Sequence, residues 1–170
     1  VRISEPKNHF ALTPCAQHRV LLAGGIGITP ILCMAERLAN IGSSFTLHYC
    51  TRSAARTAFA ERIRRSAFAD RVHFYHDDEP DTEKLDIAAV LAEPQVDVHL
   101  YVCGPTSFMD WVLGSAREAG WPDERLHREY FAAAPIDLGA VTDTGFEVQI
   151  ASTGAVIPIA PNQAVLAALA

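Results

Sequence analysis

The feature that most constrains the fold is a glycine-rich turn that joins a short apolar run to a helix. Residues 19–23 are mostly apolar, which indicates a buried strand. Residues 24–30 read Gly-Gly-Ile-Gly-Ile-Thr-Pro, and apolar side chains then recur at helical spacing over 31–39. Thr29 suits the N-cap of this helix and Pro30 suits its first position. A strand that passes through a tight turn into a helix is typical of α/β proteins.

The same alternation of strand and helix continues to residue 130. Further strands are predicted at 45–50, 71–76, 96–103 and 126–130. Helices are predicted between them at 57–68, 85–91 and 106–119. This pattern predicts an α/β fold with a doubly wound, parallel, five-stranded sheet that helices cover on both faces.

Three turns follow directly on predicted strands. They are the glycine turn at 24–30, the turn Cys50-Thr51-Arg52-Ser53 and the turn Cys103-Gly104-Pro105. Because open parallel sheets bind ligands at the carboxyl ends of their strands, we expect the functional site at these turns.

The pattern changes after Phe131. Small, loop-forming residues over 132–144 indicate a linker. Alternating residues at 146–150 and 155–159 predict a β-hairpin, and a helix is predicted to begin near Asn162. The chain opens within a predicted strand and stops within an apolar helical run, so we expect it to be an internal piece of a longer polypeptide.

Charge and composition exclude several classes of protein. Of 170 residues, 14 are Lys or Arg and 20 are Asp or Glu, a net charge of −6, which argues against a nucleic-acid partner. No apolar run is long enough to span a membrane. The four cysteines, at 15, 33, 50 and 103, lack metal-knuckle spacing, so we expect no metal site in these residues. A reducing cytoplasm is the expected compartment.

The glycine turn is suited to binding a phosphate. Glycines let a ligand approach the backbone, and the free N–H groups at a helix start attract an anion. We therefore expect a pyrophosphate to be held at Gly25, Gly27, Ile28 and Thr29. The alternative is a tight turn without a ligand. The turn also departs from the usual dinucleotide fingerprint, because Pro30 replaces its third glycine and no acid ends the second strand.

The order of these motifs resembles a known family. The glycine turn followed by Tyr-Val-Cys-Gly-Pro at 101–105 resembles the nicotinamide domain of the ferredoxin–NADP⁺ reductase superfamily. The stretches at 1–10, 49–53 and 126–131 narrow the resemblance, and the hairpin and helix at 146–170 resemble the start of a plant-type ferredoxin domain. Together they are similar to the phthalate dioxygenase reductase family, which includes vanillate O-demethylase reductase subunits.

The resemblance implies a domain order and an activity. It implies that residues 1–12 are the exit strand of a flavin domain, 13–131 an NAD-binding domain, 132–144 a linker and 145–170 an incomplete 2Fe–2S ferredoxin domain. In this family NADH gives a hydride to FMN, and single electrons then pass to a 2Fe–2S cluster and to a terminal oxygenase, an iron protein. The main FMN and cluster motifs are expected outside these 170 residues, so this piece alone is expected to be inactive.

The resemblance also implies roles for individual residues. Cys103, Gly104 and Pro105 would border the nicotinamide, although Cys103 could equally be a buried core cysteine. Arg52 and Ser53 would lie near the adenine ribose, where Arg52 could also pair with the 2′-phosphate of NADPH. Residues 129–131 would lie near the contact of flavin and nicotinamide, with Glu129 binding the coenzyme and Phe131 shielding the flavin ring. Phe131 as a core residue at a domain junction is the alternative.

Charged residues after the second and third predicted strands are interpreted as solvent-exposed surface. Arg56 is interpreted as an exposed residue at a helix start, and the acidic residues that begin at Asp77 are interpreted as a hydrated loop.

Other functions stay open at this point. One is the reductase of another flavin-dependent monooxygenase system. Another is a non-catalytic module that binds a dinucleotide without passing electrons. The sequence leaves the choice between NADH and NADPH, the aromatic substrate and the oligomeric state undetermined.

Overall fold

The computed structural model describes residues 5, 8–78, 84–92, 96–131 and 144–169. The chain separates into two compact units, Val1–Phe131 and Ala132–Ala170. Residues 132–143 of the predicted linker, and residues 1–4, 6 and 7 of the predicted exit strand, lie outside the described residues.

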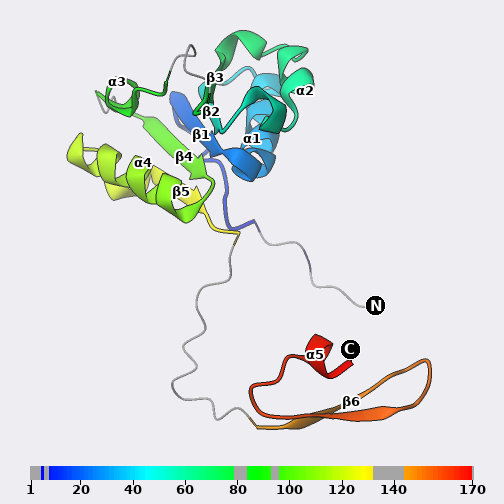
Figure 1. The fold of residues 1–170 in the computed structure, drawn as a ribbon. Coiled ribbons are helices and arrows are strands. Elements are labelled where there is room, and N and C mark those ends of the chain that lie inside the picture. Colours follow the sequence, from blue (N-terminus) through cyan, green and yellow to red (C-terminus); the bar gives the residue numbers. More distant parts are fainter. Residues whose placement is uncertain (1–4, 6–7, 79–83, 93–95, 132–143, 170) are drawn as a thin grey trace. The chain divides into compact units, whose positions relative to one another are not determined.

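The first unit is built on a parallel five-stranded sheet in the order β3-β2-β1-β4-β5 (Figure 1). The strands are β1 His18–Gly24, β2 Ser44–Thr51, β3 Val72–His76, β4 Val98–Cys103 and β5 Leu126–Glu129. The helices are α1 Ile28–Asn40, α2 Ala60–Arg64, α3 Ile87–Leu91 and α4 Thr106–Glu118, with short 3-10 turns at Gly25–Gly27, Ala54–Arg56, Ala69–Arg71 and Asp123–Arg125. The predicted doubly wound parallel sheet is confirmed.

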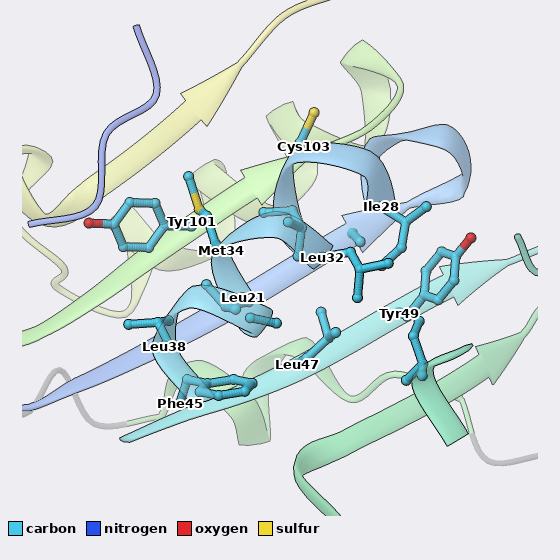
Figure 2. Close-up of a cluster of buried hydrophobic side chains, with 14 of the residues drawn as sticks. Leu21, Ile28, Leu32, Met34, Leu38, Phe45, Leu47, Tyr49, Tyr101 and Cys103 are labelled. Atoms are coloured by element: carbon cyan, nitrogen blue, oxygen red, sulfur yellow. The ribbon is translucent and has the colours of Figure 1, made fainter. Parts of the chain in front are cut away.

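Two apolar cores lie on opposite faces of this sheet. Leu21 and Ala23 pack with α1 and α2, whereas Val20 and Leu22 pack with α3 and α4. This division follows from strand geometry, because successive side chains point to opposite faces. Figure 1 shows the two pairs of helices on either side of the strands, and Figure 2 shows the core beneath α1.

Two predicted helix boundaries are wrong for local reasons. The helix α1 begins at Ile28, with Gly27 as its N-cap, and the Thr29 hydroxyl donates to the carbonyl of Ile26 at 3.2 Å instead of capping the helix. The helix predicted at 57–68 is shortened to α2. Phe59 adopts a left-handed backbone (φ 59°) before it, and the Ser66 hydroxyl donates to the carbonyl of Ile63 after it. Such side-chain hydrogen bonds compete with helix continuation.

The second unit contains an antiparallel hairpin and a short helix. The strands β6 Phe146–Gln149 and β7 Val156–Ile159 pair in register, and α5 Val165–Leu169 follows. The turn depends on Gly154, whose backbone is left-handed (φ 72°) and whose N–H donates to the carbonyl of Ile150 at 2.8 Å. The predicted hairpin is therefore present. Among the described residues of the chain, no helix has the length and apolar character needed to cross a membrane.

Candidate dinucleotide-binding site

Three strand ends meet at one edge of the sheet. The register pairs Ala23 with Cys103 and Gly24 with Cys50, so the turns after β1, β2 and β4 are neighbours. The strand order also reverses between β1 and β4, because the chain winds from β1 to β3 in one direction and returns to β4 on the other side. A reversal of this kind is the usual ligand-binding position in open α/β sheets.

Gly27 is required by packing between two of these turns. A Cβ atom at Gly27 would lie 2.1 Å from the carbonyl oxygen of Cys103 and 2.6 Å from the amide nitrogen of Gly104. A Cβ at Gly104 would in turn lie 3.0 Å from the Cα of Gly24. The turns after β1 and β4 therefore touch backbone to backbone. The absence of a side chain at Gly27 is explained without a ligand, and its predicted contact with a pyrophosphate stays a prediction.

Gly25 is the glycine of this turn that faces open space. Its backbone is left-handed (φ 53°), and no heavy atom lies within 4 Å of the position its Cβ would take. The Tyr49 hydroxyl, which comes from β2, donates to the carbonyl of Gly25 at 3.2 Å and fixes the turn. A ligand can therefore approach the backbone of Gly25 closely.

Ile28 and Thr29, at the start of α1, offer fewer free groups to a phosphate than the sequence predicted. The side chain of Ile28 is fully buried and its N–H donates to the carbonyl of Gly25. Ile28 thus presents no free amide to a phosphate, and its predicted role is left without support. Thr29 is exposed, but its hydroxyl already donates to Ile26.

A groove of about 630 Å³ begins at Gly25 and crosses the ends of β2 and β3. Its lining comes from the glycine turn, the ends of β2 and β3, and the start of α4, and consists of Gly24, Gly25, Cys50, Thr51, Arg52, Arg56, Asp77, Pro105, Ser107, Phe108 and Trp111. The ring centroids of Phe108 and Trp111 lie 6.1 Å apart. The groove thus combines open backbone, two guanidinium groups and aromatic surface.

The two arginines of the groove are available to an anion. Arg52 and Arg56 are exposed, and no described residue forms a salt bridge with either of them. Guanidinium groups bind phosphate oxygens through several N–H donors at once. The sequence predicted Arg56 as an exposed surface residue, and its position in the lining of the groove was not predicted.

A buried hydroxyl network holds the loop that carries Arg52 and Ser53. The Thr51 hydroxyl lies 2.8 Å from the Thr57 hydroxyl and 2.9 Å from Nδ1 of His76. The Thr57 hydroxyl donates to the carbonyl of Ser53 at 3.0 Å. Because all three side chains are buried, the network fixes this loop relative to the ends of β2 and β3. Ser53 does not line the groove itself.

Cys103 is fully buried at the end of β4. Its thiol donates to the carbonyl of Glu129 at 3.4 Å. Burial, and then the negative charge of Glu129, raise the pKa of Cys103 to about 11, so the thiol is uncharged near neutral pH. In Figure 2 its sulfur points away from Leu21 and Leu47, toward the edge of the cluster. A contact between Cys103 and a nicotinamide stays a prediction.

The residues predicted to lie near a flavin end the first unit. Phe131 is 55% exposed, and Tyr130 beside it is 44% exposed, with the Arg128 guanidinium 5.4 Å from its ring. Phe131 is thus not a core residue of the first unit. Its predicted contact with a flavin, and that of Glu129 with the coenzyme, stay predictions.

Sequence reasoning missed several residues of the groove. Phe108 and Trp111 carried no motif, although their position near the start of α4 was a usable signal. Asp77 was interpreted as part of a hydrated loop because its partner strand was unknown. Its place in the groove follows from the pairing of β2 with β3.

The described residues offer no metal site. Within ranges 8–78, 84–92, 96–131 and 144–169, no three His, Cys, Asp or Glu side chains come together in a way that could hold an ion. The four cysteines are unpaired thiols, two of them exposed.

Comparison with known proteins identifies the family. Residues 4–126 match the family model described as dimethylamine monooxygenase subunit DmmA-like, N-terminal domain. The chain belongs to this family. It is also 56% identical, over 98% of its length, to a vanillate O-demethylase oxidoreductase of Pseudomonas putida, and 41% identical over 95% to a tert-butanol monooxygenase / tert-amyl alcohol desaturase reductase subunit of Aquincola tertiaricarbonis.

A solved structure supports the same assignment. Phthalate dioxygenase reductase, described as a modular structure for electron transfer from pyridine nucleotides to [2Fe–2S], is 34% identical with a TM-score of 0.71. The match covers 96% of this chain and 50% of that protein. The predicted resemblance is thereby confirmed. The chain spans about half the length of the curated relatives it matches.

Proposed function

We propose that the groove binds NADH and that the complete polypeptide is the reductase component of a multicomponent oxygenase or demethylase. In this proposal electrons pass from NADH through FMN and a 2Fe–2S cluster to a terminal oxygenase of the Rieske type. The observation that carries the proposal is the groove itself. It combines accessible backbone at Gly25 with the guanidinium groups of Arg52 and Arg56, which form no salt bridge with any described residue, at the reversal of the sheet.

The groove residues fit the parts of a dinucleotide. The backbone of Gly25 and the guanidinium groups of Arg52 and Arg56 would hold the diphosphate bridge. Phe108 and Trp111 offer apolar surface for a flat ring at the groove wall. Gly104, Pro105 and Cys103 would border the nicotinamide, where the uncharged thiol of Cys103 adds no charge beside the ring.

The bound coenzyme would supply a hydride, and this chain supplies position and electrostatics. Tyr49 and the Thr51 network hold the two loops that shape the groove. FMN and the cluster would be held mainly by residues elsewhere in the complete polypeptide. The second unit would be the start of the ferredoxin domain.

The relatives support the partner in this proposal. The tert-butanol monooxygenase / tert-amyl alcohol desaturase relative is named as a reductase subunit, and the vanillate relative as an oxidoreductase. We infer a separate terminal oxygenase as the partner of the complete polypeptide. The four unpaired cysteines favour a reducing compartment, the cytoplasm.

A substitution at Gly25 tests the groove. Gly25→Ala adds a methyl group where a phosphate would approach. Because residue 25 has a left-handed backbone, alanine at this position also costs about 1 kcal/mol of folding stability. We expect NADH-driven reduction of cytochrome c by the complete polypeptide to show a KM for NADH raised about tenfold or more, because every 1.4 kcal/mol of lost binding is a factor of ten.

Gly42→Ala is the matched control for this test. Gly42 also has a left-handed backbone (φ 69°) and open space at its Cβ position, but it lies at the other end of α1. Gly42→Ala should lose the same folding stability as Gly25→Ala and keep the wild-type KM for NADH. If both variants had the same KM for NADH, the groove would not be the NADH site. If the wild-type protein bound flavin but showed no turnover, a non-catalytic module that binds a dinucleotide would be favoured.

A further inference from the structure

Among the described residues that line the groove, Asp77 is the one that carries a carboxylate. Asp77 follows β3 directly and shares the groove with Arg52 and Arg56. In many dinucleotide folds an acid at the end of the second strand holds the ribose, and the end of β2 has none. The register pairs Thr51 with His76, so the residue after β3 takes a place beside the end of β2.

The backbone of Asp77 is anchored on both sides. Its N–H donates to the carbonyl of Thr51 at 3.0 Å, and its own carbonyl accepts from Nζ of Lys84 at 2.8 Å. The same ammonium also donates to the carbonyl of His76. Asp77 is therefore held at a fixed position relative to the loop of Arg52.

The charge of Asp77 acts on the groove wall. Cys50, which also lines the groove, has a pKa raised to about 12 by burial and then by the negative charge of Asp77. This effect agrees with the groove lining in placing the carboxylate near the end of β2.

We propose that Asp77 accepts hydrogen bonds from the adenosine ribose hydroxyls and selects NADH over NADPH. This inference rests on the proposed function. The guanidinium groups of Arg52 and Arg56 match the two negative charges of a diphosphate bridge, and the described lining of the groove holds no third cation for a further phosphate. A 2′-phosphate would bring up to two more negative charges close to the carboxylate of Asp77, whereas a 2′-hydroxyl would donate to it.

The test compares Asp77→Asn with Asp78→Asn in the complete reductase. Asp78 is the next residue, is exposed and carries the same charge, but it does not line the groove. We measure kcat/KM for NADH and for NADPH in both variants and in wild type, with dye reduction as the assay. Wild type should prefer NADH, and Asp77→Asn should lower that preference about tenfold or more, mainly through a lower KM for NADPH. Asp78→Asn should keep the wild-type preference.

The other outcomes are distinguishable. An unchanged preference in Asp77→Asn, or an equal change in Asp78→Asn, would overturn the role of Asp77 and leave the proposed function intact. A wild-type preference for NADPH that is lost in Arg52→Gln would overturn the role of Asp77 and the choice of NADH, and would keep the groove as the dinucleotide site. A wild-type protein that binds and oxidises neither coenzyme would overturn the proposed function together with this inference.

Discussion

At the scale of single residues, two glycines of one turn are needed for different reasons. Gly27 has no room for a side chain because the peptide of Cys103 and Gly104 occupies that space. Gly25 has ample room, and its value lies in the left-handed backbone and the open approach that it provides. The two residues are chemically identical, so only the atoms around each one show that Gly27 serves packing and that Gly25 is open to a ligand.

This difference predicts the stability of Gly27→Ala. A Cβ only 2.1 Å from a backbone oxygen forces the two turns apart, and overpacking of this kind costs about 3 kcal/mol. Urea unfolding should show that loss. Gly114→Ala is the control, because Gly114 lies within α4 with no heavy atom near its Cβ position, and it should gain up to about 1 kcal/mol. A Gly27→Ala variant as stable as wild type would show that the turns are not in contact.

The site could be predicted from sequence only in part. The glycine motif and Arg52 were recognised because they sit at predicted strand ends. The contact of Gly27 with Cys103, and the place of Asp77 beside Thr51, depend on strand order, which joins residues far apart in the chain. Sequence spacing carries no information on that order, so the sequence pointed to Gly27 as a phosphate contact and to Asp77 as a solvated charge.

At the scale of elements, the less apolar face of β2 carries a row of polar side chains. His48 is buried between Tyr75, whose hydroxyl lies 2.9 Å from its Nδ1, and the ring of His73, stacked at 5.2 Å. Nδ1 of His18 on β1 lies 2.7 Å from the Ser44 hydroxyl of β2. The opposite face of β2, with Leu47 and Tyr49, packs into the core under α1.

This row predicts a loss of stability in acid. Burial, and then the charges of His73 and His18, lower the pKa of His48 to about 4 from 6.5. Between these values the unfolded chain binds a proton that the folded chain does not, so the free energy of unfolding falls as pH falls from 6.5 to 4. The loss amounts to about 3 kcal/mol from this group.

Urea unfolding between pH 7 and pH 4 measures this effect. His48→Gln should reduce the slope near pH 5 by about 1.4 kcal/mol per pH unit, the value for one proton. The same slope in wild type and variant would mean that His48 is protonated in the folded state.

The elements themselves were largely predicted. Each of the five strands of the first unit overlaps its predicted range. The strands β1, β2 and β4 are largely buried, and buried parallel strands leave a strong apolar signal in the sequence. The helix at α2 was predicted too long, since the left-handed Phe59 and the hydroxyl of Thr57 are used for the loop and not for a helix. Helical propensity alone could not show this tertiary demand on Thr57.

At the scale of the whole molecule, the chain consists of two units with different architectures. The first carries the groove, and the second is a hairpin with one helix that leaves Phe146, Val156 and Leu166 exposed. The domain assignments on either side of the described groove stay predictions.

The most direct test of the central claim is a crystal structure of the complete polypeptide with bound NADH. The diphosphate should lie against the backbone of Gly25, with Arg52 and Arg56 around it and the adenosine ribose beside Asp77. Its nicotinamide should lie at the turn of Cys103 and Gly104. Coenzyme bound at another face of the sheet, with this groove empty, would contradict the account.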